Sequence, residues 1–128
     1  MVLDSSAIVA VMLQEPEADL FAAKIAEAEK CQISAANYLE CAMALMARRG
    51  IGTERELDFL FEEAGIEIVP VSVAHARMAR HAFRRYGKGR HPAGLNFGDC
   101  FSYALAKSTG EPLLFKGDDF SRTDVEVA

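Results

Sequence analysis

Hydrophobic residues recur along the chain in two patterns: short apolar runs, and longer stretches in which they return every three or four positions. The short runs predict buried β-strands, and the longer period predicts amphipathic helices. We expect strands at residues 2–3, 31–33, 66–69 and 112–115, with a short edge strand at 125–127.

Helix start and stop signals divide the remaining sequence into helices. The helices expected from these signals span residues 7–13, 16–28, 35–49, 53–64, 72–86 and 99–107. The residues expected to cap or end them are Ser5 or Ser6, Ser34, a capping box of Thr53 with Glu56, Ser72, Gly50 and Gly65. Their inward faces are expected to carry Leu20, Phe21, Ile25 and Ala28, then Leu39, Ala42, Leu45 and Met46, then Leu57, Leu60 and Phe61, and then Val73, Ala76, Ala79 and Phe83.

Helices separate the predicted strands, usually two at a time. Strands joined by helical crossovers pair in parallel, and their helices cover both faces of the sheet. The pattern therefore predicts the α/β class, with a small, mostly parallel sheet of four to five strands between layers of helices. At 128 residues, the chain is expected to form one domain, 1–128, with a sizeable core.

Composition and charge narrow the classes of function. Hydrophobic residues make up 51% of the chain and charged residues 26%, which excludes a disordered protein. A formal net charge of −5 argues against a general nucleic-acid-binding protein. Residues 68–98, however, contain no Asp or Glu, so we expect one positive surface, with a solvated helix face as the alternative. The basic residues of this stretch, which would be the RNA-binding residues of a protein that acts on RNA, are Arg77, Arg80, Arg84, Arg85, Lys88 and Arg90.

The cysteines indicate the compartment rather than the chemistry. Cys31, Cys41 and Cys100 are widely spaced in apolar runs, which is typical of buried free thiols in a reducing compartment. The N-terminus has no basic segment, and no apolar stretch approaches the length of a membrane span. The sequence therefore favours a cytoplasmic protein.

Acidic residues stand where a parallel α/β fold would bring them together. Asp4 closes the first strand, Glu40 lies in an apolar helical run, Asp99 opens a helix, and Asp118 and Asp119 follow the last strong strand. The carboxyl ends of parallel strands share one edge, where ligands of open α/β sheets bind. A carboxylate cluster at that edge suits Mg²⁺ or Mn²⁺ and predicts a metal-dependent phosphoryl-transfer enzyme.

Each acidic residue also has a structural explanation. Asp4 could cap a helix, Glu40 could be a partly exposed helix charge, and Asp99 could interact with a helix dipole. Turn chemistry alone explains aspartates after Gly117. It is their conjunction at one predicted edge that favours a metal site.

Four segments carry a resemblance to a known family. They are residues 1–7 (MVLDSSA), 34–40 (SAANYLE), 85–106 (RYGKGRHPAGLNFGDCFSYALA) and 112–120 (PLLFKGDDF). Together they resemble the VapC-type toxin ribonucleases of the PIN-domain family, over essentially the whole chain.

The resemblance implies a PIN-like α/β/α sandwich, Mg²⁺- or Mn²⁺-dependent cleavage of RNA, a homodimer and a VapB-type antitoxin partner. Asp4, Glu40 and Asp99 match three acidic positions of the family. Asp4 and Asp99 would hold the principal ion, and Glu40 would ligate it or orient a water. The fourth position departs from the family pattern, and we favour Asp118, then Asp119, with Asp124 third.

The same resemblance places the antitoxin in a hydrophobic groove of the early helices. The residues expected around that groove are Val11, Met12, Leu13, Leu45, Met46 and Phe61. A basic antitoxin side chain in the acidic pocket would neutralise it.

Other classes fit the residues less well. His75, His81 and His91 have no zinc-site spacing, and the chain has neither a GxSxG motif nor a P-loop frame. A phospho-receiver domain would need adjacent acids after its first strand, whereas Asp4 stands alone. A catalytically silent PIN-like binding module is the third alternative, and the intact acidic set argues against it.

Overall fold

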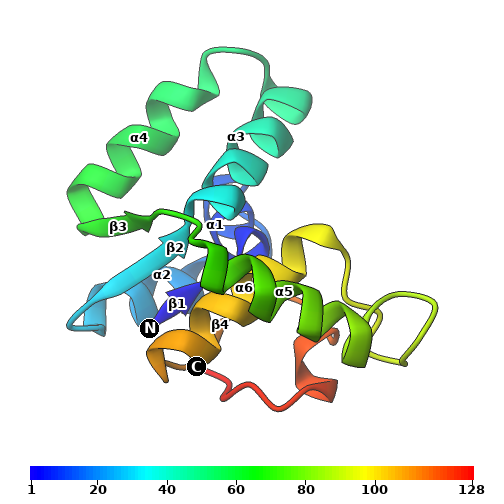
Figure 1. Ribbon diagram of the computed structural model, residues 1–128. Coiled ribbons are helices and arrows are strands. Elements are labelled where there is room, and N and C mark those ends of the chain that lie inside the picture. The colour runs from blue at the N-terminus through cyan, green and yellow to red at the C-terminus, as the bar shows by residue number, and fades with distance from the viewer.

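The computed structural model describes residues 1–128 and contains a four-stranded parallel sheet with six α-helices (Figure 1). The strand order across the sheet is β3-β2-β1-β4. The elements in chain order are β1 (Val2–Leu3), α1 (Ser5–Met12), α2 (Ala18–Glu27), β2 (Cys31–Ser34), α3 (Ala35–Arg49), α4 (Thr53–Ala64), β3 (Ile66–Val69), α5 (Val73–Tyr86), α6 (Phe97–Thr109), β4 (Leu113–Leu114) and the 3-10 turn η1 (Phe120–Arg122).

The strands are short but in register. Val2 pairs with Gln32 on one side of β1 and with Leu113 on the other, and all pairings are parallel. The expected edge strand at 125–127 is reduced to a single bridge, in which Val127 pairs with Leu113. The predicted class and the small parallel sheet are confirmed, and four strands carry the sheet rather than five.

Two hydrophobic cores lie on opposite faces of the sheet. Successive strand residues point to opposite faces, so Val2 and Leu113 enter one core, while Leu3 and Leu114 enter the other. Helices α5 and α6 cover the first face, and α1, α2, α3 and α4 supply the second core. Figure 1 shows α5 and α6 lying side by side over one face of the sheet, while α3 and α4 form a helical pair that projects beyond it. The result is the expected three-layer arrangement.

Several predicted helix signals hold. Helix α3 begins at Ala35 after its N-cap Ser34 and ends at Arg49 before Gly50. Ser72 caps α5 through a hydrogen bond from the His75 N–H to the Ser72 Oγ.

Two caps differ from the expectation. The N-cap of α1 is Asp4, whose carboxylate accepts from the Ser6 N–H at 3.0 Å, so neither Ser5 nor Ser6 caps this helix. The Thr53–Glu56 capping box is not formed, because Thr53 is already helical and its hydroxyl donates to the Gly50 carbonyl at 2.7 Å. In both places the N-cap is the residue before the expected one, Asp4 for α1 and Gly52 for α4.

Five residues assigned to inward faces are exposed. Leu20 is 58% exposed, Leu39 57%, Val73 67% and Phe83 40%, and Ala76 is exposed as well. Helical periodicity finds an apolar stripe but does not find its limits. Asn37 and Cys41 occupy the buried stripe of α3 that Leu39 was expected to share, and both are 0% exposed.

All three cysteines are free and buried, as predicted. Burial raises the pKa of the Cys41 thiol, and the nearby carboxylates of Asp4 and Glu40 raise it further. No helix combines the length and apolar character that crossing a bilayer requires.

Candidate active site

Asp4 is a buried carboxylate at the carboxyl end of the central strand β1. It is 3% exposed, and both of its oxygens accept hydrogen bonds. Oδ2 accepts from the Ser6 N–H at 3.0 Å, and Oδ1 accepts from the Ser102 hydroxyl at 2.5 Å. Asp4 is therefore both the N-cap of α1 and a fixed charge at the edge of the sheet.

Glu40 projects from α3 toward the start of α6. Its Oε1 accepts from the Ser5 hydroxyl and from the Asn37 Nδ2, the latter at 3.3 Å. The carboxylate lies against the backbone of Gly98, where a Cβ would overlap it. Glycine at this position is what allows the Glu40 carboxylate to approach α6.

Asn37 fixes the spacing between α3 and α6. It is fully buried, and its Nδ2 donates to the Gly98 carbonyl at 2.9 Å as well as to Glu40. Its Oδ1 is buried without a hydrogen-bond partner. An unpaired buried amide oxygen costs free energy, so packing of the two helices must retain it there.

Asp99 occupies the first turn of α6 and closes a reciprocal capping box. Its Oδ2 accepts from the Asn96 N–H at 3.0 Å, while the Asn96 Oδ1 accepts from the Asp99 N–H at 2.9 Å. Burial raises the pKa of Asp99 to about 7, the hydrogen bond from Asn96 opposes the rise, and the charges of Asp4, Asp119 and Glu40 add to it. The charges of three carboxylates therefore act on Asp99.

The loop after β4 distinguishes the candidates for the fourth acid. The charge of Asp119 raises the pKa of Asp99, and Asp118 is not among the charges that do so. Asp124 lies elsewhere: it accepts from the Tyr103 hydroxyl at 2.7 Å and pairs with Lys107 at 3.2 Å. The charge of Asp119 therefore reaches Asp99, whereas the contacts of Asp124 are with Tyr103 and Lys107.

No cation neutralises this cluster. The ion pairs of the chain involve other carboxylates, and Asp4, Glu40, Asp99 and Asp119 take part in none. Unpaired, partly buried carboxylates repel one another and favour a bound cation. Such a cluster is able to attract a divalent ion and, through it, an anionic substrate.

The chemistry of the donor set decides which ion fits. As the side chains stand, no group of three or more His, Cys, Asp or Glu residues is placed to hold a metal ion. Hard oxygen donors without a closed cage suit Mg²⁺ or Mn²⁺, because Mg²⁺ in proteins is commonly held by one or two carboxylates and keeps several waters. The residues present therefore fit such an ion.

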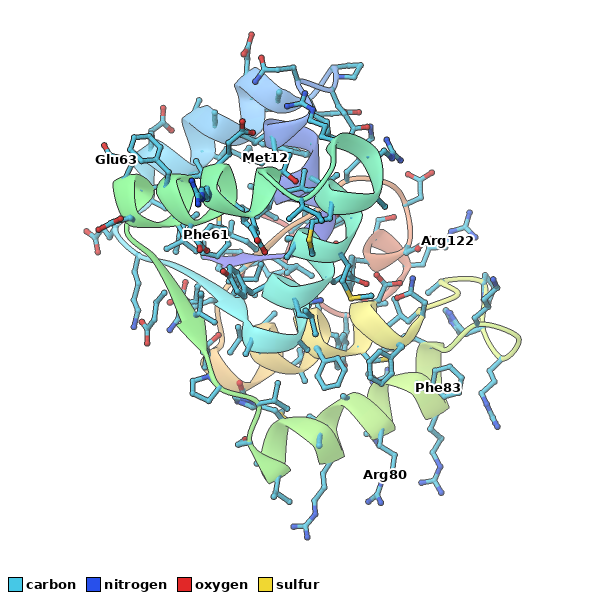
Figure 2. All side chains as sticks on the ribbon, turned by 90° about the horizontal axis from the view of Figure 1, so that it is seen from above. Met12, Phe61, Glu63, Arg80, Phe83 and Arg122 are labelled. Atoms are coloured by element: carbon cyan, nitrogen blue, oxygen red, sulfur yellow. The ribbon has the colours of Figure 1, made fainter.

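The expected basic residues divide into two groups. Arg77, Arg80 and Arg84 of α5 surround a cavity of about 360 Å³ together with His81, and none of the three forms an ion pair. Arg80 points away from the body of the protein (Figure 2). Arg85 instead pairs with Asp124 at 3.8 Å, although it also lines a second groove with Lys107. Lys88 and Arg90 lie on the loop between α5 and α6.

Sequence reasoning did not identify the neutral groups that hold the carboxylates. Ser5, Asn37 and Ser102 donate to Asp4 or Glu40, and all three are buried. The only sequence signal for them was a small polar residue within an otherwise apolar helical face, as at Asn37 and Ser102.

Comparison with known proteins identifies the relatives of this chain. Residues 1–126 match the PIN domain family. The chain is 51% identical to "Ribonuclease VapC" of Mycolicibacterium smegmatis over 125 residues, which cover 98% of this chain and 97% of that one. It is 52% identical to "Ribonuclease VapC30" of Mycobacterium tuberculosis over 126 residues, covering 98% and 95%.

Solved structures share the fold at low identity. The crystal structure of Mycobacterium tuberculosis VapC20, described as a sarcin-ricin loop cleaving toxin, superposes with a TM-score of 0.81 at 15% identity, covering 99% of this chain and 97% of that one. A toxin-antitoxin complex from Klebsiella pneumoniae gives a TM-score of 0.72 at 16% identity, covering 99% and 95%.

Replacing Asp99 with Asn should stabilise the metal-free protein at pH 8 and change it little at pH 4. Asp99 ionises near 3.8 when unfolded but near a pKa of about 7 when folded. The folded state keeps the proton between these values, so stability falls as pH rises through that window. Thermal unfolding in EDTA should show a gain of about 2–4 kcal/mol at pH 8, the upper figure corresponding to the full difference between the two pKa values and the lower one allowing for solvent screening of a partly exposed group. The exposed Asp118, replaced by Asn, is the control; an equal response of both variants would contradict this.

Proposed function

The chain belongs to the PIN-domain family, among relatives that are VapC ribonucleases, and from this premise we propose that it is a metal-dependent endoribonuclease toxin of a toxin–antitoxin module. The observation that carries the proposal is the unpaired acidic cluster, in which Asp4, Glu40 and Asp119 all act on the pKa of Asp99. We also propose that residues 1–128 function as one PIN domain, because both cores share a single sheet. The three buried free cysteines favour the cytoplasm, since free thiols are typical of a reducing compartment.

We propose that Asp4 and Asp99 hold Mg²⁺ or Mn²⁺, with Glu40 as a ligand or water-orienting group and Asp119 completing a weaker position. Asp4 suits this role because hydrogen bonds to both of its oxygens fix the plane of its carboxylate. Glu40 suits it because Ser5 and Asn37 hold one of its oxygens. A divalent ion bound here lowers the pKa of its water and clamps a scissile phosphate. The protein's own part is to hold the acceptors rigidly and to exclude competing cations.

The basic face of α5 suits the backbone of the RNA substrate. Arg77, Arg80 and Arg84 have no acidic partners, so they remain available to phosphates. Arg85 also stacks on Tyr86 at 4.8 Å from the ring centroid, and Arg90 lies 5.8 Å from that of Phe83. Because Arg80 points outward, we propose that α5 anchors RNA beyond the acidic cluster rather than at the reacting phosphate.

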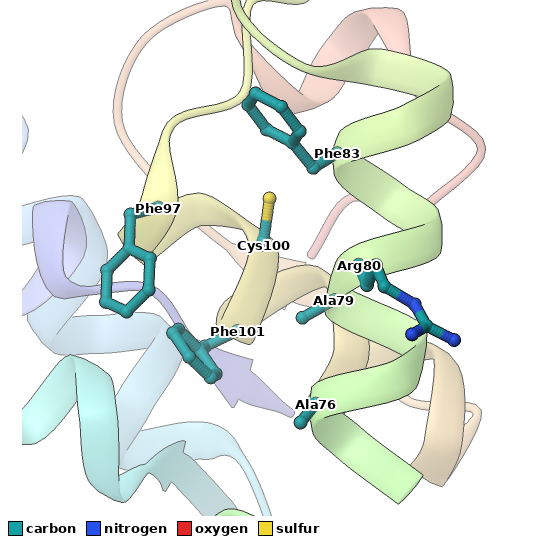
Figure 3. A pocket seen from close by; sticks show the side chains of 7 residues that line it. All are labelled: Ala76, Ala79, Arg80, Phe83, Phe97, Cys100 and Phe101. Carbon is teal, nitrogen blue, oxygen red and sulfur yellow. The ribbon is translucent and has the colours of Figure 1, made fainter.

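We propose that a second copy of the chain binds the aromatic face between α5 and α6. A cavity of about 440 Å³ lies there, and Figure 3 shows Phe97 and Phe101 beside each other while the Arg80 guanidinium points away. Phe97 is 79% exposed and Phe83, which lines the same cavity, 40%. Exposed apolar surface of this kind marks protein interfaces, and a two-fold dimer would use the same face on both copies.

We propose that the antitoxin binds between α1 and α4. A groove of about 510 Å³ there is lined by Val11, Met12, Phe59 and Leu60 with charged residues at its rim. Met12 and Glu63 lie on the side of the molecule opposite Arg80 (Figure 2). Two residues expected in this groove are unavailable, because Leu45 is 0% and Phe61 6% exposed, whereas Phe59 is 65% exposed. A basic antitoxin side chain reaching the carboxylates would neutralise them.

Replacing Asp4 with Asn should reduce the rate of Mn²⁺-dependent RNA cleavage by more than about 100-fold, which is the usual size of the rate decrease when a catalytic group is lost. The amide keeps the cap acceptor, so the fold should persist, as circular dichroism will check. Cleavage of a fluorophore-labelled RNA at saturating Mn²⁺ is the measurement. Asp119→Asn should slow cleavage and Asp118→Asn should not. Full activity of Asp4→Asn would remove this residue from the mechanism.

Reversing charge at Arg84 with Glu should weaken RNA binding and lower the slope of log affinity against log salt by about 1. Fluorescence anisotropy with the catalytically reduced Asp4→Asn background measures binding without cleavage. Arg49→Glu, an exposed arginine in the last turn of α3, is the matched control. Equal slopes for the two variants would refute the assignment of α5.

Replacing Phe97 with Glu should convert the proposed dimer to a monomer, because a charge would be buried at the centre of an apolar contact. Light scattering after gel filtration measures the mass. Ile51→Glu is the control, since Ile51 is 78% exposed but lies in the loop between α3 and α4. A wild-type protein that is monomeric at all concentrations, or a Phe97→Glu variant that stays dimeric, would exclude this interface.

A further inference from the structure

Ser102 is a fully buried hydroxyl that connects α6 to the central strand. It is 0% exposed and lies three residues after Asp99, one turn farther into the helix. Its Oγ donates to the Asp4 Oδ1 at 2.5 Å, across 98 positions of the sequence. One helix thus supplies one carboxylate of the cluster and the hydrogen-bond donor to another.

The choice of partner is unusual for a serine within a helix. Buried Ser and Thr hydroxyls commonly donate to the carbonyl three or four residues earlier in their own helix. Ser108 and Thr109 of α6 do so, both donating to the Leu105 carbonyl. Ser102 instead points across to β1, while the Gly98 carbonyl one turn back accepts from Asn37.

The apolar surroundings of Ser102 make its hydrogen bond to Asp4 necessary. Its neighbours in the helix, from Tyr103 to Ala106, are all buried in the apolar core on that face of the sheet. A hydroxyl in such surroundings must be hydrogen-bonded, and so must a carboxylate that is 3% exposed. Each group satisfies the other, and neither has room to rotate.

We propose that Ser102 is a positioning residue that holds the Asp4 carboxylate in the orientation required to bind the divalent cation. This inference rests on the proposed function. Groups that hydrogen-bond to metal ligands fix the orientation of those ligands, and their loss typically weakens metal binding by 10–100-fold. Without the hydroxyl, Asp4 Oδ1 loses its only hydrogen bond from a side chain, and only the Ser6 N–H on Oδ2 remains to orient the carboxylate.

The test is Mn²⁺ binding to the RNA-free protein by calorimetry. Ser102→Ala should weaken binding by about 10-fold or more, and the RNA-cleavage rate should recover substantially when Mn²⁺ is raised to saturation. Ser108→Ala is the matched control on the same helix and should bind Mn²⁺ as the wild type does. If Ser102→Ala does not fold, Ser102→Cys keeps the size but donates weakly, and should shift affinity in the same direction.

The possible results distinguish the positioning role of Ser102 from the proposed ribonuclease function on which it rests. If Ser102→Ala melts at a lower temperature but its folded form binds Mn²⁺ as tightly as the wild type, Ser102 is merely structural and the inference is overturned. If the wild type binds no Mn²⁺ and cleaves no RNA, the proposed function fails and this role fails with it. A weaker affinity in both Ser102 variants, with Ser108→Ala unchanged, supports the inference.

Discussion

Repulsion among carboxylates at one edge of the sheet is the constraint on which the rest of the structure depends. Asp4, Glu40, Asp99 and Asp119 have no basic partners, and burial and mutual repulsion raise the pKa of Asp99 to about 7. Such a cluster costs stability in the absence of a cation. The surrounding fold must therefore keep these carboxylates close together, because in a flexible loop they would move apart.

Helix α6 provides most of the contacts that keep the carboxylates together. Gly98 leaves the space that the Glu40 carboxylate occupies, Asp99 contributes a charge while closing its own N-terminal capping box, and Ser102 donates to Asp4. Donors from two other elements complete the support, because Ser5 and Asn37 both donate to Glu40. The carboxylates are thus fixed by neutral donors, which orient them without cancelling the charge that a cation requires.

The surfaces proposed for partners lie on different sets of helices. The groove that suits an antitoxin lies between α1 and α4, whereas the aromatic face and the unpaired arginines share α5, and Arg80 lines both of them. The aromatic face also adjoins the acidic cluster, because Phe97 and Cys100 flank Gly98 and Asp99 in α6. An antitoxin held in the groove between α1 and α4 needs only one basic side chain at the carboxylates to neutralise them.

The sequence alone was enough to predict the extent of α3 and β3, the parallel α/β class and the three acidic residues at one edge of the sheet. These features follow from hydrophobic periodicity, helix capping and strand ends, which each depend on a few neighbouring residues. Tertiary structure alone decided among Asp4, Ser5 and Ser6 for the N-cap of α1, exposed Leu39 to solvent, and brought the charge of Asp119 close enough to raise the pKa of Asp99. It alone also brought Asn37 to Gly98 and Ser102 to Asp4. These contacts join residues far apart in the chain, and a hydroxyl or amide carries no sequence signal of which distant oxygen packing will bring within reach.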